Sequence, residues 1–179
     1  TPVNALPERF KIEISGGTDI ISDTSNNATF SAISTKENVI NNNEISIFLS
    51  PLSTLVSSII ESSITSSSVD INTIISNSKT TIAKAFNINV GEINKDYINE
   101  QNGNVAKLTQ KLNIISDTLV NTLGNSLSKN DIFTSPANTI NEPSTGNLFN
   151  IDNTNSISNI IKNVEADKYI TIDNNLKTN

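Results

Sequence analysis

The sequence contains no cysteine, histidine, methionine or tryptophan, and only two tyrosines. Without cysteine, disulfides, thiolate catalysis and cysteine-based metal sites are all excluded. Without histidine, the chain lacks the usual general base near neutral pH and the commonest metal ligand. Ser-His-Asp and Cys-His catalysis are therefore excluded within this chain, and the composition predicts a protein that is not an enzyme.

Positive charge is also scarce, because 12 Lys and Arg stand against 18 Asp and Glu, for a net charge of -6. No basic cluster or run of aromatic residues offsets this balance, so we expect no nucleic-acid partner. No apolar run approaches the length that crosses a bilayer, so we expect no membrane span.

Asn, Ser and Thr together supply roughly two residues in five, far above average usage. An acidic chain rich in these residues is typical of an exported or cell-surface protein, so we expect an extracellular or surface location. An ordinary protein from an AT-rich genome explains the same composition. The length of 179 residues fits one domain or two small ones.

Residues 1–49 are predicted to form a small antiparallel β portion. Residues 9–15 alternate apolar and polar side chains, the pattern of a half-buried strand, and Gly16-Gly17 permits a turn with positive φ. Further strands are expected over 29–34 and 44–49, with a loop between them over 36–43. The apolar side chains of the first strand are Phe10, Ile12 and Ile14.

Residues 50–124 are predicted to form a helical portion. Ser50 is a good N-cap and Pro51 is favoured at the first helical position. Further helices are expected from Asp70 or Ile71 to Phe86, over 92–101 and over 104–123. The helix that begins at Pro51 carries an apolar stripe of Leu52, Leu55, Val56, Ile59 and Ile60.

Residues 125–179 are predicted to hold a Pro- and Asn-rich linker over 125–155, a short helix near Ile157 and a terminal strand, Tyr169-Ile170-Thr171-Ile172. The whole chain is therefore expected to have an α+β fold, a small antiparallel β portion followed by helical hairpins.

Two segments together resemble a known family. The segment from Leu6 to Asp19 includes Ile12-Glu13-Ile14-Ser15-Gly16-Gly17-Thr18-Asp19, and the second segment is Ser50-Pro51-Leu52-Ser53-Thr54-Leu55-Val56. They resemble the end of a carboxypeptidase-regulatory-like, Ig-type β-sandwich and the helix start that follows it in large bacterial extracellular, adhesin-like proteins. The resemblance spans roughly residues 6–124 and implies no catalytic residues.

The chain departs from this family in two ways. The sandwich strands expected before Leu6 are missing, and the usual Ala-rich helices are rich in Ile, Ser and Asn here. The first departure predicts a fragment, or a subunit that completes its sheet with another chain.

Asp19 and Asp23 lie close together in a polar turn, and such oxygen donors can hold Ca²⁺. Ordinary turn hydrogen bonding by Asp explains the same residues. Glu92 and Asp96 fall four residues apart on one expected helix, and a solvated helix face explains this pair better than a sugar-cleaving site. The segment starting at Asp152 faintly resembles a calcium loop, but it lacks the required Gly and Glu.

These observations predict a non-enzymatic structural module or repeating subunit of a cell-surface or extracellular assembly, such as an adhesin, matrix or filament protein. The predicted partners are other copies of the chain or other surface proteins. A sheet with few strands leaves edges that invite strand addition, so the N-terminal segment or Tyr169–Ile172 is expected to pair across subunits. A calcium- or carbohydrate-binding module and a virion surface or fibre protein are the alternatives.

Overall fold

The computed structural model describes residues 5–19, 24–25, 29–42, 47–64, 69–97 and 103–123. It also describes single positions further along the chain: Phe133, Ala137, Ile140, Asp152, Asn155, Ser158, Asn159, Ile161 and Lys162.

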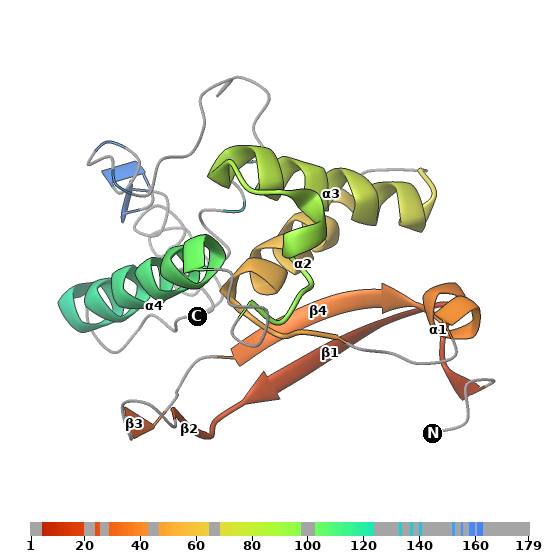
Figure 1. The fold of residues 1–179 in the computed structure, drawn as a ribbon, viewed down its shortest axis with the longest axis horizontal. Helices are drawn as coiled ribbons and strands as arrows, with labels where there is room; N and C mark the ends of the chain where they lie inside the picture. The colour runs from red at the N-terminus through yellow and green to blue at the C-terminus, as the bar shows by residue number, and fades with distance from the viewer. Residues whose placement is uncertain are drawn as a thin grey trace, which may run out of the picture.

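The fold is an α+β arrangement, as the sequence predicts. Strands β1 (Arg9–Ser15) and β4 (Thr29–Thr35) form a two-stranded antiparallel sheet. A minimal hairpin of β2 (Thr18–Asp19) and β3 (Thr24–Ser25) lies between them in sequence. In Figure 1 the helices lie above the sheet, with β4 on the side of the helices and β1 farther from them. These helices are α2 (Pro51–Ile64), α3 (Ile71–Phe86) and α4 (Gly103–Leu123).

The two long strands pair along their whole length, with Arg9 opposite Thr35 and Ser15 opposite Thr29. The alternating pattern of residues 9–15 therefore predicted a real strand. After it, Gly16 and Gly17 adopt φ of 79° and 94°. Residues other than glycine rarely adopt such positive φ values, so the glycine pair allows the chain to turn at the end of β1.

Serine residues on both sides of Pro51 start helix α2. The backbone N–H of Ser53 donates to Ser50 Oγ at 3.2 Å, and the N–H of Ser50 donates to Ser53 Oγ at 2.9 Å. This reciprocal arrangement satisfies two backbone donors, as in a capping box, with serine in the place of Glu or Gln. The predicted N-cap is confirmed.

Helix α3 also begins and ends as its sequence predicts. The side chain of Asp70 accepts a hydrogen bond from the N–H of Thr73, and Asn87 ends the helix in the left-handed conformation. Helix α4 confirms the long helix expected over 104–123.

One hydrophobic core joins the sheet to the helices. Its buried members include the stripe of α2, and Phe30 and Ile33 of β4 pack against it. Phe133 and Ala137, from the segment expected to be a linker, are also buried in this core. They are described as helical, together with Ile140. The linker expectation is therefore wrong at these positions, where spaced apolar residues outweigh the surrounding Asn, Ser and Pro.

The loop expected over 36–43 is wrong, because residues Lys36–Asn42 form helix α1. Thr35 ends β4 and caps this helix, since its Oγ1 accepts from the N–H of Asn38 at 3.4 Å. Val39 is 6% exposed, so the short helix buries an apolar side chain. Capping and this buried contact offset the poor helix propensity of its asparagines.

Two further expectations are corrected. The strand expected over 44–49 is wrong at residues 47–49, which have no strand structure. The helix expected over 92–101 is wrong at residues 92–97, where a 3-10 turn, η2 (Val90–Glu92), is followed by turns that continue to Tyr97. Residues 98–101 lie outside the described residues. Within the described residues the β portion is a two-stranded sheet with a small hairpin, so a β-sandwich is not present there. The expected strand Tyr169–Ile172 lies outside the described residues.

Candidate functional site

The outer edge of β1 is open in the part of the chain that the structure describes. In an antiparallel pair, alternate residues bond the partner strand and the residues between them point their backbone groups outward. Ser31 points outward on β4, because it bonds to α2, and its partner across the sheet is Glu13. The same alternation turns the backbone groups of four β1 residues outward, away from β4: Arg9, Lys11, Glu13 and Ser15.

An additional bond supports this assignment. The N–H of Lys36 donates to the carbonyl oxygen of Glu8 at 3.0 Å. Glu8 and the other even-numbered residues of this segment therefore face β4, and the odd-numbered residues face away from it. The described part of the chain leaves these outward donors and acceptors of β1 unpaired, and such a row is a template for one more strand.

The opposite edge of the sheet is closed by side chains of α2. Thr54 Oγ1 accepts a hydrogen bond from the N–H of Ser31 at 3.0 Å, and Ser53 Oγ donates to the Ser31 carbonyl at 2.8 Å. Both α2 residues are buried. The two edges therefore differ, since β4 is partly capped within the chain and β1 is not.

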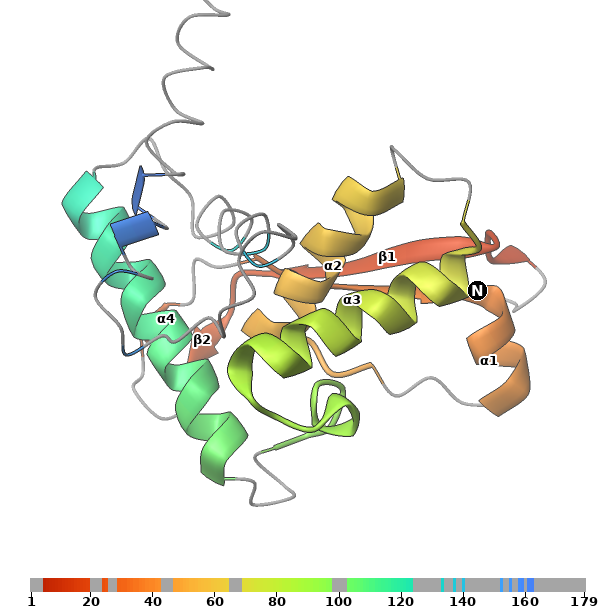
Figure 2. The ribbon, with the colours of Figure 1, turned by 90° about the horizontal axis from the view of Figure 1, so that it is seen from above.

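Helix α2 also reaches across the sheet to β1. Lys11 Nζ lies 2.9 Å from Glu61 Oε1 and 2.9 Å from Glu13 Oε1. In Figure 2, α2 crosses β1 and its C-terminal end extends beyond the strand. Strand and helix enclose a cleft of about 320 Å³, which is lined by Arg9, Phe10, Lys11, Ile33, Glu61 and Ile64.

The electrostatics of the cleft centre on Lys11. Partial burial by itself lowers the pKa of its ammonium group, but hydrogen bonds and charges from Glu13 and Glu61 outweigh burial, so the pKa is raised. Lys11 is therefore a fixed positive charge near neutral pH. Arg9 is exposed and forms no ion pair with any residue that the structure describes, so it adds a second positive charge at the same edge.

The apolar side chains of β1 lie on the other face of the sheet. Side chains alternate along a strand, so Phe10, Ile12 and Ile14 point away from the face where Lys11 meets α2. Phe10 and Ile12 are half-buried, and Ile14 is 54% exposed. An added strand with apolar residues at alternate positions would extend this row.

Only one of the two residues predicted to hold calcium is described by the structure. Asp19 lies in β2, opposite Thr24 of β3, while Asp23 lies outside the described residues. Among the residues with described positions, no three Asp or Glu side chains are grouped closely enough to hold a metal ion.

The other carboxylates singled out from the sequence have structural partners. Glu92 accepts a hydrogen bond from the N–H of Asn89 at 3.0 Å and so completes a capping box on η2. Asp152 forms an ion pair with Lys111 of α4, at 2.7 Å. These contacts favour the structural interpretation of Glu92 over a sugar-cleaving site, and that of Asp152 over a calcium loop.

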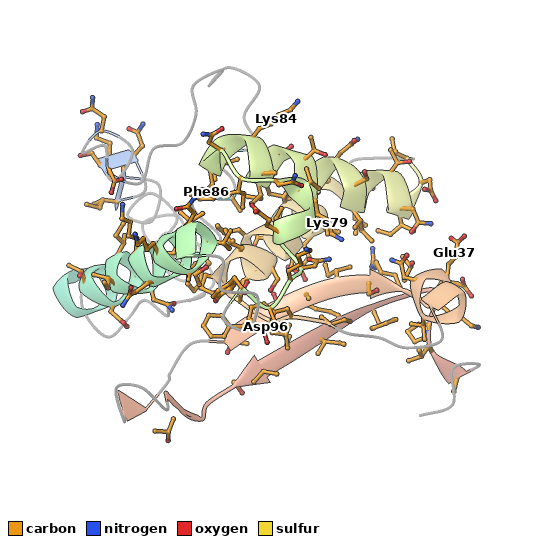
Figure 3. All side chains as sticks on the ribbon, viewed as in Figure 1. Glu37, Lys79, Lys84, Phe86 and Asp96 are labelled. Atoms are coloured by element: carbon orange, nitrogen blue, oxygen red, sulfur yellow. The ribbon has the colours of Figure 1, made fainter. Side chains whose placement is uncertain are left out.

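Lys79 of α3 is a group that the sequence did not single out. Figure 3 shows it on the side of α3 turned toward the sheet, whereas Lys84 points away from the molecule. Burial lowers the pKa of Lys79. Burial also raises the pKa of Tyr97, partly offset by its hydrogen bond to Thr109 and assisted by the charge of Asp96. Lys79 lies in α3, whereas Asp96 and Tyr97 are neighbours in the turns that follow η2.

Sequence reasoning also missed Ser53, Thr54 and Glu61, the α2 residues that contact the sheet. Ser53, Thr54 and Ser57 interrupt the apolar stripe, yet all three are buried. The buried positions of Ser53 and Thr54 reflect hydrogen bonds to a strand edge and to the carbonyl of Ser50, which periodicity alone does not reveal. The only signal in the sequence was the Ser/Thr cluster directly after Pro51.

No protein-family model, curated protein or solved structure matches this chain. The resemblance to carboxypeptidase-regulatory-like surface modules therefore stays a prediction. None of the described helices combines the length and apolar character needed to cross a membrane.

Proposed function

We propose that this protein is a non-enzymatic structural module, a repeating subunit of an extracellular or cell-surface assembly whose copies join by strand addition. The observation that carries the proposal is the open edge of β1, which presents outward backbone groups along seven residues while side chains of α2 cap β4. Proteins normally protect such an edge or use it for binding.

Backbone bonds alone are too weak to hold two copies together. Each hydrogen bond contributes about 1 kcal/mol net. A four- to eight-bond ladder therefore supplies about 4–8 kcal/mol, which is comparable to the roughly 4–15 kcal/mol that association costs. The surplus has to come from side chains, and the edge offers them on both faces. The half-exposed apolar row lies on one face and the cleft beside Lys11 on the other.

The composition supports the non-enzymatic part of the proposal. A chain without histidine or cysteine has few ways to activate a nucleophile at neutral pH. Its Ser-, Thr- and Asn-rich acidic sequence suits an extracellular location, which immunolabelling of intact and permeabilised source cells tests directly.

The assembly is tested with Glu13→Pro. The N–H of Glu13 faces away from β4, so proline removes a donor from the open edge without removing a bond from the β1–β4 ladder. Glu13→Ala is the matched control, because it loses the same carboxylate and keeps the N–H. Sedimentation velocity should show oligomers for the native chain and Glu13→Ala, and a weaker or absent oligomer for Glu13→Pro. A monomeric native chain, or equal assembly of both variants, overturns the proposal.

A further inference from the structure

The geometry points to one occupant for the open edge. We infer that the segment Asp167–Asp173 of a second copy binds antiparallel to β1, under the C-terminal end of α2. This inference rests on the proposed function and adds the identity of the incoming strand, its direction and its register. The segment contains Tyr169–Ile172, the strand predicted from the sequence.

The end of α2 that extends beyond β1 favours an extended segment, rather than the β1 strand of a second copy, as the added strand. Antiparallel β1 strands of two copies would be related by a two-fold axis perpendicular to the sheet, which places both α2 helices on the same face. In Figure 2 the end of α2 already extends beyond β1, and the Lys11–Glu61 contact holds it there. Two such helix ends would compete for the same space, since packed helices need about 8–10 Å between their axes. A tail without its own covering helix avoids this conflict.

Side-chain patterns then set the register. The odd residues of β1 face α2, and an incoming strand should place its polar side chains on that face. In the register that sets Asp173 opposite Arg9, Thr171 lies opposite Lys11, at the cleft. Arg9 has no ion-pair partner within the described residues, so the Asp173 carboxylate supplies the missing charge.

The same register extends the apolar row on the other face. Ile172 lies opposite Phe10, and Ile170 lies opposite Ile12, the two half-buried side chains of the row. Lys168 then falls beside Ile14, which is 54% exposed, so its charged end stays in water. A parallel arrangement would instead place Lys168 beside Phe10 and leave Ile172 beside the exposed Ile14.

The described end of the chain favours a neighbour as the donor. Ile161 packs against the helical core, and in Figure 1 the helices lie on the side of β4. The open edge of β1 lies on the far side of β4 from this position. The connection from Lys162 to Asp167 is short, at most about 18 Å when fully extended, which favours the tail of another copy.

Engineered cysteines test the register directly, because the chain has no native thiols. Ile14 and Lys168 would be a non-hydrogen-bonded pair, the closest kind of cross-strand neighbour. Oxidised Ile14→Cys/Lys168→Cys should form disulfide-linked dimers and longer chains on non-reducing gels. Ile14→Cys/Tyr169→Cys, in which the second cysteine lies on the opposite face, should lose this product. Disulfides within one chain would overturn the claim that a second copy donates the strand. Cross-linking of Ile14→Cys/Ile172→Cys in place of Ile14→Cys/Lys168→Cys would overturn the antiparallel direction. Equal cross-linking in all pairs, or none in any, would overturn the register.

Mixing two blocked variants separates this inference from the function it rests on. Glu13→Pro blocks the accepting edge, and Thr171→Pro removes an N–H that would face β1 in the donor. Each should associate about 10- to 100-fold more weakly with itself. An equimolar mixture should form a one-to-one complex through the intact edge of one and the intact tail of the other. If Thr171→Pro assembles like the native chain while Glu13→Pro does not, the edge is used but the tail is not its occupant. If neither variant weakens assembly, the proposed function itself fails.

Discussion

Thr54 Oγ1 accepts a hydrogen bond from the backbone N–H of Ser31 at 3.0 Å, and this bond joins α2 to the free side of β4. The hydroxyl of Thr54 also donates to the carbonyl of Ser50 at 2.8 Å. One side chain therefore serves both the helix start and the strand edge. Where such a bond is present the edge is closed, and along β1 no described residue supplies one.

The first prediction concerns this closed edge. Thr54→Val keeps the shape of the side chain but leaves the buried N–H of Ser31 without an acceptor. We expect the free energy of unfolding to fall by about 1–3 kcal/mol. Thr80→Val is the control, because the Thr80 hydroxyl only bonds its own helix, to the carbonyl of Ser76. It should change stability by less than about 0.5 kcal/mol. Urea unfolding measures both, and similar losses in the two variants would show that Thr54 does not close the edge.

The second prediction concerns the C-terminal tail. Deleting residues 165–179 should abolish assembly, because the deletion removes the predicted donor strand. Far-ultraviolet circular dichroism should keep the helical signal of α2, α3 and α4, none of which includes the deleted residues. Light scattering after size-exclusion chromatography gives the oligomeric state. A truncated chain that forms the native oligomer would rule out the tail as the donor.

The third prediction concerns a buried hydroxyl in α2. Ser57 Oγ is buried and has no hydrogen-bond partner among the residues that the structure describes. Ser57→Ala removes this unsatisfied group and improves helix propensity, so we expect stability to rise by about 0.5–1 kcal/mol. Ser78→Ala is the matched control, because Ser78 is equally buried but bonds the carbonyl of Ile74 at 2.8 Å. Thermal unfolding should rank Ser57→Ala above Ser78→Ala, and the reverse order would contradict the assignment.

The fourth prediction concerns pH. Burial lowers the pKa of Lys79 below its ordinary value of 10.5, so the unfolded chain holds this proton to higher pH than the folded chain does. The free energy of unfolding should therefore rise with pH, between the lowered pKa of the folded state and 10.5. Lys79→Met should remove this rise. Near neutral pH it should also raise the free energy of unfolding, by less than about 1 kcal/mol, because water still screens a half-buried lysine. The exposed Lys84, replaced in the same way, controls for the loss of one positive charge. An unchanged pH slope in Lys79→Met would show that burial of Lys79 carries no penalty.

Much of the fold follows from local sequence. The alternation of residues 9–15 predicted β1, and Ser50, Asp70 and the stripe of α2 predicted two helices at close to their observed ends. These features depend on neighbours three or four residues away, or on a period of two, which a single sequence reveals.

The failures have a common physical origin in tertiary contacts. Helix α1 depends on Thr35, a strand residue that also caps the helix, and on burial of Val39. Phe133 and Ala137 join the core from a polar, Pro-containing segment. The candidate site shows the same limit, since the alternation located β1 but did not show that α2 covers its polar face.

The most direct test of the central claim is amide hydrogen exchange along β1, followed residue by residue in dilute and in assembled samples. In the dilute chain, the N–H groups of Lys11 and Glu13 should exchange quickly, while those of Phe10, Ile12 and Ile14, which face β4, should be protected. Assembly should protect Lys11 and Glu13 as well, because an added strand bonds their outward groups. If these two amides exchange equally fast in the assembled state, no strand joins β1 and the account is contradicted.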